Sequence, residues 1–226
     1  MPLAARELFG AALPLAERYA ALLAGAGVER GLVGPREADR LWDRHLLNCA
    51  VVAELIAPDA DVLDIGSGAG LPGVVFGILR PDLSITLLEP LLRRVTFLTE
   101  CVTELGLENL AVRRARAEEV VGEFSADVVT ARAVAPLDRL LQWGLPLLRP
   151  GGELLAMKGE RAAAELDTAA PVLRSFGVRT AELRQVGHGM VDPPTTIVRV
   201  VAERRPPSQV SAAKRGGRKR GKRFRP

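Results

Sequence analysis

From Asp61 onward the sequence alternates short apolar or β-branched runs with longer stretches that have helical periodicity. This alternation constrains the fold strongly, because parallel strands need a crossover connection, which is usually a helix. The strand-like runs are Val62–Ile65, Ser84–Leu88, Leu110–Arg113, Val128–Ala131 and Glu153–Met157. The stretches between and after them predict helices at Pro72–Leu79, Leu91–Leu105, Leu137–Leu148 and Glu160–Phe176. The pattern therefore predicts an α/β domain with a parallel sheet.

Two further strand-like runs, Arg179–Val186 and Thr195–Ala202, follow the last predicted helix. No helical pattern separates them, and antiparallel neighbours need only a short connection. We therefore expect them to pair as an antiparallel hairpin. With the five preceding strands, this hairpin makes a seven-stranded, mostly parallel sheet.

Two helical patterns precede the alternating part of the chain. The first runs from Leu3 to Ala26 and stops at a glycine pair, and the second runs from Ala38 to Ile56 and ends before Pro58. We expect them to form an N-terminal helical cap. The predicted organisation is a cap over residues 1–58, a main domain over 59–204 and a basic tail over 205–226.

The basic residues are concentrated at the carboxyl end of the chain. Residues 208–226 hold eight Lys and Arg and no acidic residue, which leaves 23 of the 31 basic residues against all 27 acidic ones in the rest. The formal charge of +4 thus divides into +8 for this segment and −4 for residues 1–207. Such a segment cannot bury enough apolar surface to fold alone, so we predict a disordered arm. It would bind phosphate backbones weakly, or serve only to keep the chain soluble.

The remaining composition predicts an ordinary globular protein of the cytoplasm. No apolar run reaches the roughly 18 residues that a membrane span needs, and the first residues lack the order of a secretory signal. We expect no membrane partner. Cys49 and Cys101 have no second Cys or His at metal-ligand spacing, so we interpret both as small buried residues and expect no metal site.

Gly66-Ser67-Gly68-Ala69-Gly70 leaves a predicted strand and enters a predicted helix. Glycines in this context let a ligand approach the backbone, and the helix start offers free N–H groups. The spacing differs from the G-x-G-x-x-G of dinucleotide sites, and no P-loop Lys follows. An NAD-type site and a purely structural turn remain alternatives, and the candidate that we favour is S-adenosylmethionine.

Two acidic residues favour this cofactor. Asp64 stands just before the turn and could receive the ammonium of the cofactor, directly or through water. Glu89 closes the second strand, where a carboxylate can accept hydrogen bonds from both ribose hydroxyls. An adenine placed beyond that ribose would lie near Ala117 and Glu118. The alternative role for Glu118 is that of an acid at a helix start, where the helix dipole favours it.

Several segments together resemble one family, the small-subunit ribosomal RNA guanine-N7 methyltransferases, formerly called glucose-inhibited division protein B. The similar segments, spread between about residues 5 and 203, are Trp42-Asp43-Arg44-His45-Leu46-Leu47-Asn48, Asp64 to Gly73, Arg93 to Leu98, Thr130-Ala131-Arg132-Ala133 and Met157-Lys158-Gly159. The resemblance implies a Rossmann-like class I fold that binds S-adenosylmethionine. It implies transfer of a methyl group to N7 of one guanine in 16S rRNA, with the rRNA or the small subunit as partner.

The resemblance also implies site residues. Cofactor contacts are expected at Gly66, Leu71, Ala117, Glu118 and Arg132, in addition to Gly68 and Gly70 of the turn and the two acids Asp64 and Glu89. Arg132 and Lys158, at the ends of the fourth and fifth strands, are candidates for aligning the substrate. We expect a monomer, and we expect His45 and His188 to be structural.

The residues fit this chemistry. Guanine N7 has an in-plane lone pair and needs no deprotonation, so alignment and electrostatics can suffice. Neither cysteine lies in an element where it could act as a nucleophile, and the fourth strand lacks the Asn/Asp-Pro-Pro segment of adenine-amine methyltransferases. Arg132 suits contact with guanine O6, a phosphate or the cofactor. Alternatives are a methyltransferase for another RNA or a small molecule, or a non-catalytic RNA-binding module.

Overall fold

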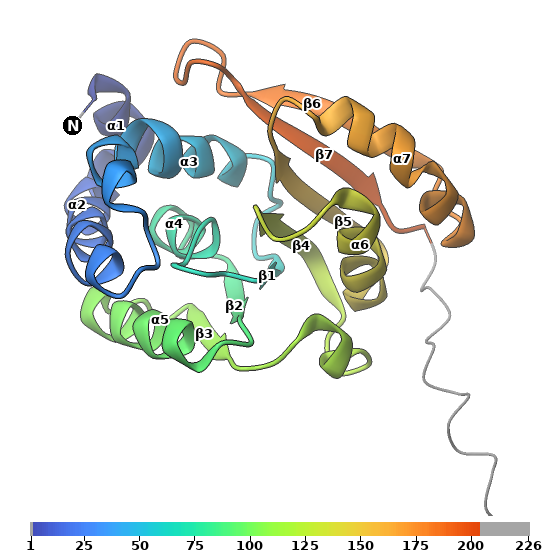
Figure 1. Cartoon of the computed structure of the whole chain (residues 1–226), viewed down its shortest axis with the longest axis horizontal. Coiled ribbons are helices and arrows are strands. Elements are labelled where there is room, and N and C mark those ends of the chain that lie inside the picture. Colours follow the sequence, from blue (N-terminus) through green and yellow to red (C-terminus); the bar gives the residue numbers. More distant parts are fainter. Residues whose placement is uncertain (1, 204–226) are drawn as a thin grey trace, which may run out of the picture.

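The computed structural model describes residues 2–203 and forms one seven-stranded sheet with helices on both faces (Figure 1). The strand order is β3-β2-β1-β4-β5-β7-β6, and only β7 runs antiparallel to its two neighbours. The expected mostly parallel sheet with a terminal antiparallel hairpin is therefore confirmed. The strands are β1 (Asp61–Ile65), β2 (Ser84–Leu88), β3 (Leu110–Arg113), β4 (Ala126–Arg132), β5 (Leu148–Lys158), β6 (Thr180–Val186) and β7 (Thr195–Val201).

The helices of the main domain alternate with these strands, as the periodicity predicted. One end differs, because the helix expected over Leu137–Leu148 stops at Gly144 and is followed by a 3₁₀ turn, and Leu148 belongs to β5. The helices are α4 (Gly73–Leu79), α5 (Leu92–Leu105), α6 (Leu137–Gly144) and α7 (Ala162–Ser175), with 3₁₀ turns η5 (Ala117–Val120) and η6 (Leu145–Leu147).

The helical cap is present, but its first helix is not continuous. The chain breaks at Gly10, whose φ is 48°, and Phe9 before it packs edge-on against Trp42 with the ring centroids 5.9 Å apart. Periodicity missed this break because it reports which face is apolar and not whether the helix axis is continuous. The cap elements are α1 (Leu3–Phe9), η1 (Gly10–Ala12), α2 (Leu13–Leu22), η2 (Leu23–Gly27), η3 (Pro35–Arg40), η4 (Trp42–Leu46) and α3 (Leu47–Ala53).

The cap and the main domain share one hydrophobic core. Buried residues of α2 and α3 belong to the same cluster as those of α4 and α5 on one face of the sheet, whereas α6 and α7 cover the other face. The expected boundary near residue 58 falls between α3 and β1, and the division into units stays a prediction. The predicted basic tail lies outside the described residues.

Successive residues of a strand face opposite sides of the sheet. In β1, Val62 belongs to the core beneath the cap, α4 and α5, and Leu63 and Ile65 belong to the core beneath α6 and α7. Asp64 therefore faces the same side as Val62. This alternation decides where each functional side chain of the strands points.

The start of β5 is a site where only glycine fits. A Cβ on Gly152 would lie 2.9 Å from the carbonyl oxygens of Ala126 and Asp127 and 3.0 Å from that of Arg149. Because these oxygens belong to the backbone, none of them can move away without a shift of the chain that carries it.

We predict that Gly152→Ala lowers the free energy of unfolding by about 1–3 kcal/mol, because overpacking against backbone shifts the β4–β5 pair. Urea unfolding followed by circular dichroism measures it. Gly25→Ala is the matched control, since a Cβ there meets nothing within 4 Å. Equal stability of the two variants would contradict this account.

Candidate active site

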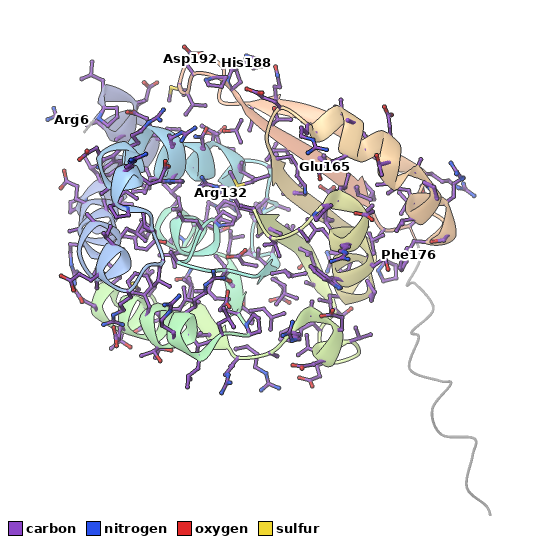
Figure 2. The ribbon with its side chains drawn as sticks, in the orientation of Figure 1. Arg6, Arg132, Glu165, Phe176, His188 and Asp192 are labelled. Atoms are coloured by element: carbon purple, nitrogen blue, oxygen red, sulfur yellow. The ribbon has the colours of Figure 1, made fainter. Side chains whose placement is uncertain are left out.

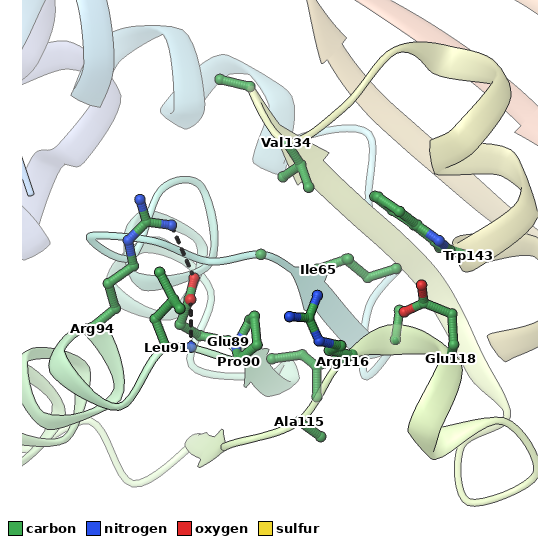
Figure 3. A pocket seen from close by; sticks show the side chains of 14 residues that line it. Ile65, Glu89, Pro90, Leu91, Arg94, Ala115, Arg116, Glu118, Val134 and Trp143 are labelled. Carbon is green, nitrogen blue, oxygen red and sulfur yellow. Dashed lines mark hydrogen bonds and ion pairs between the residues drawn. The ribbon is translucent and has the colours of Figure 1, made fainter.

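A pocket of about 410 Å³ opens at the carboxyl ends of β1 and β2, beside the segment that follows β4 (Figure 3). Its size lies in the range of small-molecule sites, and open α/β sheets bind ligands beyond the carboxyl ends of their strands. The residues that line it are Ile65, Gly66, Leu88, Glu89, Pro90, Leu91, Arg94, Ala115, Arg116, Ala117, Glu118, Ala133, Val134 and Trp143.

The glycine-rich turn borders this pocket through its first residue, Gly66. Gly66, Gly68 and Gly70 have φ of 67°, 60° and 102°, a region that other residues rarely adopt. The N–H groups of Gly66 and Ser67 both donate to the Leu88 carbonyl, which fixes the turn to the end of β2. Gly66 lines the pocket, and a Cβ on it would lie 2.9 Å from Val134, which also lines it.

Glu89 lies in the pocket wall with a side chain that is only 1% exposed. Its Oε2 accepts the Gly68 N–H at 3.0 Å and its Oε1 accepts the Leu91 N–H at 3.0 Å. Arg94 adds an ion pair at 3.5 Å, drawn in Figure 3. The carboxylate is therefore held in place by the turn on one side and the start of α5 on the other.

Asp64 is placed differently from Glu89. It is fully buried on the α4 side of β1, and its Oδ2 accepts the Gly73 N–H at 3.1 Å. Its Oδ1 has no hydrogen-bond partner among the described residues, and burial raises the pKa of Asp64 to about 7. Asp64 does not line the pocket, and its expected contact with a cofactor ammonium stays a prediction.

The remaining predicted residues of the turn also lie behind the pocket wall. Gly68, Gly70 and Leu71 are absent from the lining. A Cβ on Gly70 would lie 2.5 Å from Val74 and 2.8 Å from the Tyr19 hydroxyl oxygen, so this glycine is required by close packing. Their contact with a ligand is a prediction that the geometry leaves untested.

Ala117 and Glu118 line the far end of the pocket, as their position after β3 predicted. The acid that caps η5 is Glu119, whose carboxylate accepts the Arg116 N–H at 2.9 Å. Glu118 is exposed and free of that role, and Figure 3 shows it on the same side of the pocket as Trp143. The sequence analysis missed Trp143, because an aromatic residue in an amphipathic helix such as α6 is typical of ordinary packing.

Arg132 ends β4 and faces the cap (Figure 2). Its guanidinium donates to the Arg44 carbonyl at 2.9 Å, lies 3.4 Å from the Cys49 sulfur and contacts Nδ1 of His45. His45 Nε2 in turn lies 2.9 Å from Glu37. Arg132 thus ties the end of β4 to η4 and α3, and it is not among the residues that line the pocket.

Lys158 ends β5 and faces α7 on the opposite side of the sheet. Its Nζ donates to the Ala135 carbonyl at 2.7 Å and to Glu165 at 2.8 Å. Glu165 also accepts the Leu137 N–H at 2.8 Å, so the pair holds the segment between β4 and α6. The two predicted basic residues, Arg132 and Lys158, are therefore not brought together. Glu165 was missed by sequence, where an acid in a first helical turn is unremarkable.

The described part of the chain has neither a group of three or more His, Cys, Asp or Glu placed to hold a metal ion nor a helix long and apolar enough to cross a membrane. Cys49 and Cys101 are both free and buried, as expected.

The raised pKa of Asp64 has a consequence for stability. An unfolded Asp has a pKa of about 3.9. Since the folded carboxyl holds its proton up to about pH 7, this group lowers the free energy of unfolding as the pH rises from about 4 to about 7.

We predict a smaller loss of stability between pH 5 and pH 8 in Asp64→Asn than in the unchanged protein, measured by urea unfolding at both pH values. Asp61→Asn, at the exposed start of the same strand, is the control. An unaltered pH dependence in Asp64→Asn would refute the assignment.

Solved structures share the fold. A putative S-adenosylmethionine-dependent methyltransferase from Methanococcus maripaludis superposes with a TM-score of 0.56 at 13% identity, over 73% of this chain and 90% of that one. A methyltransferase of the same class from Aquifex aeolicus gives 0.54 at 18% identity, over 75% and 99%. These similarities establish the seven-stranded methyltransferase fold.

Relatives in sequence are much more similar. A ribosomal RNA small subunit methyltransferase G from Thermobifida fusca is 60% identical, over 96% of each chain. The protein of the same name from Streptomyces avermitilis is 57% identical, over 95% of this chain and 90% of that one. The family model described as rRNA small subunit methyltransferase G matches residues 12–190. With a pocket at the expected sheet edge and this match over most of its length, the chain belongs to the rRNA small subunit methyltransferase G family.

Proposed function

We propose that this protein transfers the methyl group of S-adenosylmethionine to N7 of a specific guanine in 16S ribosomal RNA. The observation that carries the proposal is the pocket between the glycine turn and Glu89, in a chain of this family. We further propose that it acts as a cytoplasmic monomer on the rRNA or the small subunit.

The residues present fit S-adenosylmethionine. The turn at Gly66 has no room for a Cβ and presents backbone to the ligand, and Glu89 offers an acceptor where a ribose would lie. Ala117 and Glu118 are positioned for the adenine. We assign the cofactor to Gly66, Glu89, Ala117 and Glu118, which line the pocket. The turn residues Asp64, Gly68, Gly70 and Leu71 would act from behind it.

Glu89 has a double role in this proposal. Both of its oxygens already accept backbone N–H groups, so each would receive a ribose hydroxyl as a second hydrogen bond. A carboxylate oxygen has the lone pairs for this. The same side chain would then hold both the turn and the cofactor, which makes the shape of the turn part of the binding site.

When bound, S-adenosylmethionine supplies a methyl group on a sulfonium sulfur, open to in-line attack by a ring nitrogen. Guanine N7 attacks without first losing a proton, so this chain needs to orient the base and exclude water. The segment Ala133–Pro136 between β4 and α6 borders the pocket and is held at both ends, by Arg132 on the cap side and by Lys158 with Glu165 on the other. We assign it to base alignment.

Arg132 and Lys158 would serve the substrate from the ends of that segment. The terminal N–H groups of Arg132 contact the cap, which leaves its Nε–H to donate to guanine O6 or to a phosphate. The Lys158 ammonium already donates to Ala135 and Glu165, so its main effect would be on the shape of the segment.

Activity can be measured with labelled S-adenosylmethionine and small subunits that lack the modification. We expect label at one guanine N7, detected by chemical cleavage at the methylated base. Naked 16S rRNA, a transfer RNA and total small-molecule extract are parallel substrates. Label found only in a different substrate would overturn the rRNA assignment. A protein that binds RNA but does not bind S-adenosylmethionine would be a non-catalytic RNA-binding module.

We predict that Glu89→Gln weakens S-adenosylmethionine binding by about tenfold or more, because hydrogen bonds to a charged group contribute roughly 1.5–3 kcal/mol. Isothermal titration calorimetry measures the dissociation constant. Glu123→Gln, an exposed acid paired with Arg113, is the control and should bind normally. Wild-type affinity in a folded Glu89→Gln protein would show that the ribose assignment is wrong.

A further inference from the structure

Tyr19 is the single tyrosine of the chain, and it lies in α2 of the cap, far in sequence from the glycine turn. Its side chain is fully buried, and its hydroxyl donates to the Ala69 carbonyl at 2.8 Å. The two residues are 50 positions apart. A side chain of the cap therefore reaches the middle of the turn that borders the pocket.

The turn is held at a second point by Glu89. Gly68, directly before Ala69, donates its N–H to Glu89 Oε2. Gly70, directly after it, packs so closely against Tyr19 that a Cβ there would lie 2.8 Å from the hydroxyl oxygen. Gly68 and Gly70 have φ of 60° and 102°, and glycines have the largest conformational freedom to lose. Fixing the Ala69 carbonyl restricts the peptide groups on both sides.

The Tyr19 hydroxyl keeps the proton that it donates to the Ala69 carbonyl. Burial raises the pKa of Tyr19 well above its ordinary value, so the phenol stays protonated throughout the physiological range. The ring is enclosed by the core that joins the cap to α4 and α5. Neither the donor nor the ring has freedom to move away from Ala69.

We propose that Tyr19 is a positioning residue for cofactor binding, which sets the shape of the Gly66–Gly70 turn through the Ala69 carbonyl. The inference rests on the proposed function, since it names how the cap serves the same pocket. The proposal gives the cap a role in cofactor binding, which the position of α2 in the sequence does not predict. The cap makes a second contact near the site at the end of β4, where Arg132 donates to the Arg44 carbonyl.

The substitution that tests this is Tyr19→Phe, which keeps the ring and removes only the hydroxyl. We expect the dissociation constant of S-adenosylmethionine to rise about two- to tenfold in calorimetry, the range of a single neutral hydrogen bond. The KM for the cofactor should rise by a similar factor, with kcat at saturating cofactor nearly unchanged. Circular dichroism should show the same fold.

Thr195→Val is the matched control. It also removes a hydroxyl that ties the cap to another element, since Thr195 donates to Asn48 Oδ1 at 2.6 Å and is 8% exposed, but it does not touch the turn. We expect it to lower stability without changing cofactor affinity. If Tyr19→Phe only loses stability and binds the cofactor as the unchanged protein does, the inference is overturned and the proposed function stands.

A second measurement does not depend on the variant being folded. Because the chain has one tyrosine, incorporation of 3-fluorotyrosine labels Tyr19 alone. We expect its fluorine-19 resonance to shift on titration with S-adenosylmethionine, with a titration curve that gives the calorimetric dissociation constant. An unmoved resonance at full occupancy would contradict the inference, and absence of binding in calorimetry would overturn the proposed function as well.

Discussion

The backbone of the turn after β1 approaches its neighbours so closely that no side chain fits at its two ends. At Gly66 the neighbour is Val134, from the segment after β4, and at Gly70 it is Tyr19 from the cap together with Val74 of α4. The turn thus contacts the helix that directly follows it and two parts of the chain that are distant in sequence, the cap and the segment after β4. Its N–H groups at Gly66 and Ser67 are fixed by β2, and that at Gly68 is fixed by Glu89. These restraints fix the turn beside the pocket that Gly66 and Glu89 line.

The cap and the sheet act together in this arrangement. Cap residues share one core with α4 and α5, and polar contacts also join the cap to the site: Tyr19 contacts the turn, and Arg44, His45 and Cys49 contact Arg132. On the other face of the sheet, Lys158 and Glu165 hold the chain after β4. The segment that borders the pocket is therefore fixed from both faces. Pre-organisation of this kind reduces the free-energy cost of ordering the site when a ligand binds.

Sequence periodicity predicted the sheet well and the cap less well. The five parallel strands lie where short apolar runs predicted them, because a buried parallel strand is short, apolar and bounded by turn residues. The strands β6 and β7 were predicted as a hairpin because no helical pattern separates them. The break at Gly10 was missed, since the apolar face continues across it. Glu89, Ala117 and Glu118, which follow the ends of strands, line the pocket, and their cofactor contacts stay predictions. Asp64 was expected beside the ligand and lies behind the turn, where alternation along β1 directs it toward α4.

By itself, the sequence determined the strand and helix order, the glycine turn at the end of β1 and the family resemblance, since all three depend on local patterns. The tertiary structure alone decided that Arg132 turns toward the cap and Lys158 toward α7, although both end neighbouring strands. The face that a strand residue occupies depends on pairing register, and β4 and β5 shift register between Ala126 and Val128. The contact of Tyr19 with Ala69 likewise exists only because the cap packs on α4 and α5, and no local pattern encodes a contact between residues so far apart in the chain.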